Sequence, residues 1–110
     1  MKITESTRNN IRIVQLQGRV DSEGAIDMEL GLQEMTEAGS SQVILDLSQV
    51  TYINSAGLRI LADMLTRTQA NGGDLLLAGP SQKIRRVFQI IGFDNFFRLF
   101  DDVDSAVEAF

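Results

Sequence analysis

Hydrophobic residues follow two different periods along the chain, and the period changes where Gly, Asn, Asp or Ser interrupts the pattern. Segments 2–7 and 11–18 are β-prone and flank Arg8-Asn9-Asn10, which predicts an antiparallel hairpin with an Asn-rich turn. Segments 42–47 and 74–78 are short, dense apolar runs, as expected for strands that are buried on both faces.

Helical spacing fills the stretches that follow these strands. Asp21 or Ser22 suits the N-cap of a first helix, which ends at Gly39 and the two serines after it. Its apolar stripe consists of Gly24, Ala25, Met28, Gly31, Leu32 and Met35. A second helix runs from Ser55 to about Ala70, and only a narrow stripe of it is polar. Its apolar residues are Leu58, Ile60, Leu61, Ala62, Met64 and Leu65.

The last third of the chain predicts two more helices around one short strand. Ser81 follows a Gly-Pro turn and caps a helix that ends at Gly92. The inward residues of this helix are Ile84, Val87, Phe88 and Ile91. Segment 96–100 predicts a short strand, and Asp102 caps a terminal helix. The inward residues of that helix are Val103, Ala106, Val107 and Phe110.

The elements therefore follow the order β-β-α-β-α-β-α-β-α, which predicts an α/β fold. We expect a mixed, mostly parallel sheet of four to five strands with about four helices, in a single domain over residues 1–110. Ligands and partners of such sheets meet the loops at the carboxyl ends of the strands. The segment YINSAGLR at 52–59 contains one of these loops.

Composition excludes several classes of function. The chain has no cysteine and no histidine, which removes thiol chemistry, the usual neutral-pH base and the commonest metal ligand. A net charge of −5 argues against nucleic-acid binding. The basic cluster Lys83, Arg85 and Arg86 is interpreted as the solvent-facing side of a helix. Without a membrane-length apolar run or a secretion signal, we expect a cytoplasmic protein.

The candidate chemistry is sparse. Asp21 and Asp46 are expected near the same edge of the sheet, where paired carboxylates can bind Mg²⁺ or share acid-base work, but caps and turns explain both residues more simply. Gly72-Gly73 lacks the rest of a phosphate-binding loop, and Ser55 lacks the frame of a nucleophile elbow. We therefore expect no catalytic residue, metal or cofactor, and no enzyme activity.

Two surface features remain. Ile26 and Leu30 lie opposite the apolar stripe of the first helix, either as scattered surface residues or as a contact for another protein. Ser55 stands at the start of the second helix, either as its cap or as a group presented to a partner. A phosphate there would suit the helix and change an interface.

The segment DLSQVTYINSAGLRIL resembles the signature of STAS domains, especially that of anti-sigma factor antagonists. Three further stretches resemble the family in the same order: GRVD at 18–21, GGDLLLAGPSQKIRRVFQIIGFDNFF at 72–97, and DDVDSAVEAF at the C-terminal end. The likeness therefore spans nearly the whole chain.

The resemblance implies a regulator of transcription that switches partners. The unmodified antagonist binds an anti-sigma factor that is also a serine kinase, phosphorylation at the residue matching Ser55 releases it, and a phosphatase resets it. Asp21, Gly57 and Leu58 match positions at the partner surface or helix entry. Family members usually have Asp where this chain has Asn54, which keeps the capping ability but loses one negative charge.

Two other hypotheses stay open at this point. Stand-alone STAS domains also resemble accessory subunits of membrane transport systems, including lipid transporters, in which the domain binds an ATPase. Asn54 fits this reading slightly better. A small-molecule or nucleotide-binding module is the third, although neither a phosphate loop nor a catalytic base is found.

Overall fold

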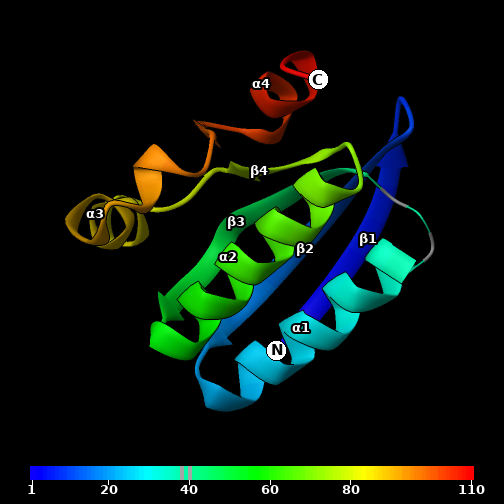
Figure 1. Cartoon of the computed structure of the whole chain (residues 1–110). Coiled ribbons are helices and arrows are strands. Elements are labelled where there is room, and N and C mark those ends of the chain that lie inside the picture. Colours follow the sequence, from blue (N-terminus) through cyan, green and yellow to red (C-terminus); the bar gives the residue numbers. More distant parts are fainter. Residues whose placement is uncertain (38, 40) are drawn as a thin grey trace.

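The computed structural model describes residues 1–37, 39 and 41–110, and in this part of the chain five strands form one sheet (Figure 1). The elements, in chain order, are β1 (Lys2–Arg8), β2 (Ile11–Val20), α1 (Ser22–Glu37), β3 (Gln42–Ile53), α2 (Ser55–Ala70), β4 (Asp74–Ala78), α3 (Gln82–Ile91), a 3₁₀ turn η1 (Phe93–Asn95), β5 (Leu99–Phe100) and α4 (Val103–Glu108). The predicted α/β class and element order are confirmed.

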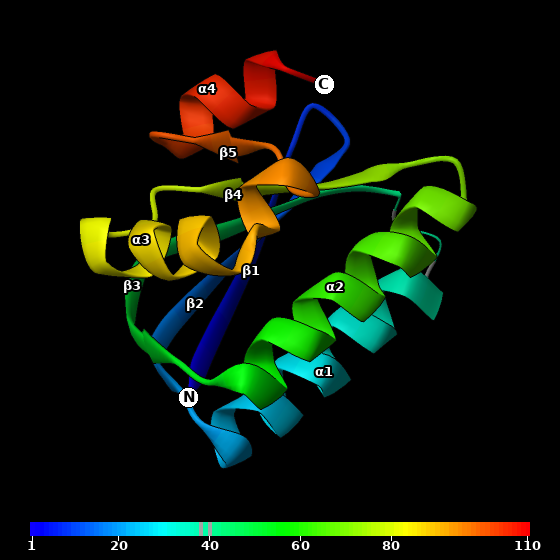
Figure 2. The ribbon, with the colours of Figure 1, turned by 60° about the vertical axis from the view of Figure 1, so that its left-hand side comes forward.

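The sheet has the strand order β1-β2-β3-β4-β5, with β1 antiparallel and all later pairs parallel. Each crossover therefore steps in the same direction across the sheet, and right-handed crossovers of this kind place their helices on one face. Residues of α1, α2 and α3 accordingly share one hydrophobic core, while α4 packs on the opposite face (Figure 2).

The hairpin forms as predicted, with Asn9 and Asn10 as its two turn residues. Both have positive φ, 54° at Asn9 and 65° at Asn10, as a type I′ turn requires. Asn tolerates this left-handed backbone better than other residues with a Cβ. The turn sets the register in which Ile3 lies opposite Leu16, and this register holds Ile3 against the main core.

The main core lies between the sheet and the three crossover helices. Its fully buried side chains include Leu16, Met28, Leu45, Leu61, Leu77 and Phe88. A smaller core on the other face joins Ala106 of α4 to Ile11, Ile13, Ile44, Leu76 and Ala78. The central strands are thus buried on both faces, as their uninterrupted apolar pattern predicts.

β3 is longer than the sequence pattern predicts. The expected strand ended at residue 47, whereas the observed one continues to Ile53. The pattern is broken by Ser48 and Gln49, but β2 follows β3 past this point through two register shifts and keeps it paired. As a result β3 leads directly to α2, with Asn54 as the only residue between them.

The expected meeting of Asp21 and Asp46 at one edge of the sheet is wrong for this reason. Asp21 directly follows β2, but Asp46 lies inside the lengthened β3, opposite Gln15. The Asp46 carboxylate accepts a hydrogen bond from the Ser48 backbone N–H at 3.0 Å, and so supports the strand locally. Among the described residues, no group of three or more Asp or Glu side chains could hold a metal ion.

Three expectations in the last third need correction. Ile91 is 46% exposed and Phe110 36% exposed, because each lies at the end of its segment, beyond the stripe that faces the sheet. The strand expected over 96–100 is only Leu99–Phe100, since the backbone N–H groups of Phe96 and Phe97 donate to the Phe93 carbonyl and so continue the turn of η1. The caps at Ser81 and Asp102 are confirmed: each accepts a hydrogen bond from the backbone N–H three residues later.

Candidate functional site

The entrance of α2 is capped by Asn54 rather than by Ser55. The Asn54 side chain accepts a hydrogen bond from the Gly57 backbone N–H at 3.0 Å. Its own backbone N–H donates to the Val20 carbonyl at 3.0 Å, which ties the start of α2 to the end of β2. The expectation that Asn54 keeps the capping ability is confirmed, and the alternative in which Ser55 caps the helix is wrong.

Ser55 is therefore available for another purpose. It is the first residue of α2 and is exposed, and its hydroxyl makes no hydrogen bond within the part of the chain that the structure describes. The first turn of a helix has free N–H groups and a partial positive charge. The geometry thus presents a hydroxyl to solvent at a place where an anion is electrostatically favoured.

Gly57 and Leu58 fix the position of this turn. Gly57 is buried, and a Cβ there would lie 2.5 Å from the Val20 side chain and 3.0 Å from that of Ile53. Only a residue without a side chain lets α2 start this close to the sheet. Leu58 is half-buried against the main core, so its outer part alone faces solvent.

Asp21 occupies the corresponding place at the start of α1. Its carboxylate accepts a hydrogen bond from the Gly24 backbone N–H at 2.9 Å, as the predicted cap requires. This bond, helped by the Arg19 guanidinium and opposed by partial desolvation, lowers the pKa of Asp21 below its ordinary value. Asp21 is therefore ionised at neutral pH, and it is only one residue away from Val20, which holds Asn54.

Arg19 and Tyr52 complete this edge of the sheet, and sequence reasoning missed both. The Arg19 guanidinium lies 4.3 Å from the centre of the Tyr52 ring, and its Nε is 3.9 Å from the Asp21 carboxylate. The two residues face each other in the register of β2 and β3. Nothing in the local pattern reveals this contact, because it depends on a register shift between strands far apart in the chain.

The other candidate surface residues lie on two different helices. Ile26 and Leu30 of α1 are 58% and 56% exposed, so their expected position opposite the core is confirmed. Lys83 and Arg86 of α3 are exposed, while Arg85 is partly covered and its guanidinium is 3.2 Å from Asp101. These groups lie on the same side of the sheet as α2.

Among the described residues, the acidic groups form no metal site, and the side chain of Ser55 has no base within hydrogen-bonding distance. No helix among them is long and apolar enough to cross a membrane. The fold and the site together define a small α/β domain that displays a serine at a helix entrance.

Comparison with known proteins identifies the family. The model of the STAS domain matches residues 2–106, and the chain belongs to this family. A Bordetella bronchiseptica protein named as the anti-sigma factor antagonist BtrV is 34% identical over 110 residues, covering 100% of this chain and 95% of the relative. The resemblance to STAS proteins of the anti-sigma factor antagonist type is thereby confirmed.

Two solved structures share the fold at low sequence identity. A Thermotoga maritima protein described as an anti-sigma factor antagonist superposes with a TM-score of 0.92 at 22% identity, covering 97% of this chain and 92% of the other. The phosphorylated form of the Bacillus cell-fate determinant SpoIIAA gives a TM-score of 0.76 at 16% identity and covers 98% of each chain. At these identities the likeness is one of fold.

The observed cap gives a first test. We expect Asn54→Ala to lower the free energy of unfolding by about 1 kcal/mol, because the Gly57 N–H loses its acceptor. Ser55→Ala should change stability by less than about 0.5 kcal/mol, since its hydroxyl has no hydrogen-bond partner among the described residues. Urea unfolding of both variants measures the difference. Equal losses would contradict the assignment of the cap to Asn54.

Proposed function

We propose that the protein is an anti-sigma factor antagonist that regulates transcription by switching partners. In its unmodified state it binds an anti-sigma factor that is also a serine kinase. Phosphorylation at Ser55 ends this interaction, and a phosphatase restores it. The observation that supports the proposal best is the hydroxyl of Ser55 at the start of α2, which is exposed and has no hydrogen bond to any residue that the structure describes. The name of the BtrV relative and the phosphorylated SpoIIAA structure agree with it.

A phosphate on Ser55 would act on the interface and leave the fold intact. The hydroxyl makes no hydrogen bond to the described part of the domain, and the first turn of α2 favours a negative charge. The modification adds about 1.5 to 2 negative charges near pH 7. Asp21, already ionised, lies at the neighbouring helix start. The phosphate and the Asp21 carboxylate together would repel acidic groups of the partner, and removing both charges from water in the complex would lower the affinity. Asn54 is neutral and therefore does not repel the phosphate.

The proposed contact surface is built from the two helix entrances. Asp21, Asn54, Ser55 and the exposed part of Leu58 form it, and Gly57 sets its position by letting α2 approach the sheet. We include Ile26 and Leu30 as a further protein contact on α1, because both are more than half exposed. Since the relatives reported above are antagonists by name, the transporter-subunit alternative is not favoured.

The experiment has two parts. The protein is incubated with its cognate kinase and ATP, and the phosphate is located by mass spectrometry; we expect it on Ser55 and its loss in Ser55→Ala. Binding of the kinase is then measured by calorimetry for the wild type, Ser55→Ala and Ser55→Asp. We expect Ser55→Asp to raise the Kd at least about tenfold, which corresponds to about 1.4 kcal/mol, and Ser55→Ala to bind nearly as the wild type does.

The matched control is Ser81→Asp, which places the same charge at the entrance of α3, where Ser81 caps the helix. Asp is as good a cap as Ser, so this variant should fold and bind normally. Unchanged affinity of Ser55→Asp would remove Ser55 from the contact surface. If the kinase binds tightly but never phosphorylates Ser55, the protein keeps its proposed binding function and the proposed phosphorylation switch is excluded.

A further inference from the structure

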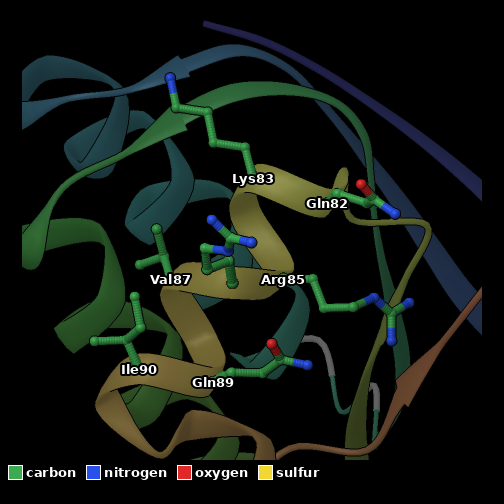
Figure 3. Close-up of a pocket in the computed structure, with 7 residues that line it drawn as sticks. Gln82, Lys83, Arg85, Val87, Gln89 and Ile90 are labelled. Carbon is green, nitrogen blue, oxygen red and sulfur yellow. The ribbon is translucent and has the colours of Figure 1, made fainter.

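The outer side of α3 combines positive charge with exposed apolar side chains. Lys83 and Arg86 are exposed, and Ile90 is 77% exposed. Val87, which the sequence pattern places on the inward side, is only partly covered. Figure 3 shows Val87 and Ile90 together on one side of α3, with Arg85 extending from the other side. A hollow of about 610 Å³ follows this surface. We call Lys83, Arg86, Val87 and Ile90 the basic stripe.

The charge of this helix is opposite to that of the rest of the domain. α3 has three basic residues and no acidic one, so it contributes +3 to a net charge of −5 and leaves −8 for the remaining chain. Arg85 is engaged by Asp101, but Lys83 and Arg86 form no ion pair within residues 1–37, 39 and 41–110. A surface that fits the basic stripe must therefore offer both carboxylates and apolar side chains.

The outer side of α1 offers this combination. This helix has five acidic residues and no basic one: Glu23, Asp27, Glu29, Glu34 and Glu37. Glu34 and Glu37 are exposed and have no ion pair among the described residues. They continue the same outer face toward the C-terminal end of α1 from the exposed pair Ile26 and Leu30, which are one helical turn apart. We call Ile26, Leu30, Glu34 and Glu37 the acidic stripe.

We propose that a second copy of this chain covers these surfaces, with the acidic stripe of one copy docked on the basic stripe of the other. Each stripe has two apolar side chains about one turn apart beside charges of a single sign, and the signs are opposite. Apolar contact supplies the driving force, and the charges select the partner helix and its orientation.

The arrangement of the helices makes the contact reciprocal. α1 and α3 belong to the same layer of the fold, on opposite sides of α2 (Figure 2). Because α2 separates them, the two stripes pair between copies and not within one. In a pair of copies related by a twofold axis, α1 of each copy would face α3 of the other, which gives a closed dimer with two equivalent contacts.

The oligomeric state tests this directly. Sedimentation equilibrium across a range of protein concentrations should show a reversible dimer for the wild type. Two charge-reversal variants are compared with it, Lys83→Glu/Arg86→Glu and Glu34→Lys/Glu37→Lys. Each should raise the dimer dissociation constant at least about tenfold, because like charges then face each other. Mixing the two variants should restore association, since each reversed stripe again meets its opposite.

The control variant is Lys2→Glu/Arg98→Glu, which makes the same change in net charge as Lys83→Glu/Arg86→Glu but on residues outside α1 and α3. It should dimerise as the wild type does, and circular dichroism should show that all variants are folded. A wild type that stays monomeric at its solubility limit overturns the proposal. So does a dimer whose dissociation constant neither charge reversal changes, and so does a mixture of the two reversed variants that stays monomeric. The measurement needs no anti-sigma factor. Because Ile26 and Leu30 also belong to the contact surface proposed above, dimerisation and binding of a partner to α1 would exclude each other.

Discussion

Replacing Phe88 by Ala is expected to lower the free energy of unfolding by about 3 to 5 kcal/mol, the usual range for a fully buried Phe. The ring is completely inaccessible to solvent, and its centre lies 6.0 Å from that of Phe93 in a stacked arrangement. Because Phe88 and Ile84 are the buried residues of α3, truncation leaves a cavity under that helix. Urea unfolding gives the change in midpoint and slope.

Phe96→Ala is the matched control, because it removes the same ring from a position that is 70% exposed. It should cost less than about 1 kcal/mol. A Phe88→Ala variant no less stable than Phe96→Ala would show that α3 does not depend on this core contact. An unfolding slope that falls together with the midpoint would instead indicate that α3 detaches before the sheet unfolds.

The sequence pattern predicts most of the fold because most helices and strands have a clear hydrophobic pattern and distinct boundaries in the sequence. Helix α2 and strand β4 occupy the predicted residues, since Asn-Gly-Gly separates a long amphipathic run from a short apolar one. The extension of β3 to Ile53 was missed because its second half is held by pairing with β2, over irregular register, and not by an apolar pattern of its own. Local periodicity contains no information about such pairing.

The candidate site was predictable in location but not in detail. The placement of Ser55 at the helix start follows from the pattern alone. That Asn54 takes the capping role depends on where β3 ends, which fixes Asn54 as the single linking residue. The stacking of Arg19 on Tyr52 arises between segments far apart in the chain, and so does the close approach of Gly57 to Val20. Tertiary contacts of this kind have no local signature.

Among these contacts, the approach of Gly57 to Val20 should have the second-largest effect when it is disturbed. We expect Gly57→Val to lower the free energy of unfolding by about 3 kcal/mol, at the upper end of the usual cost of overfilling a core. The new Cβ would lie 2.5 Å from the Val20 Cγ1 atom, which is itself fully buried and cannot rotate away. The branched side chain also brings little gain in helix propensity to offset the clash.

Gly31→Val is the control for this change, because it puts the same side chain in a helix where the nearest atom is the flexible end of Ile3, at 3.3 Å. It should cost less than about 1 kcal/mol, as a single methyl can shift. Thermal or urea unfolding compares the two variants, and kinase binding is measured at a temperature where both are folded. Relief of the clash requires the first turn of α2 to move away from β2, which would displace Ser55 relative to Asp21. Gly57→Val should therefore weaken binding of the kinase even when the variant is folded, whereas Gly31→Val should not. Equal stability of the two variants would mean that α2 does not need this close approach.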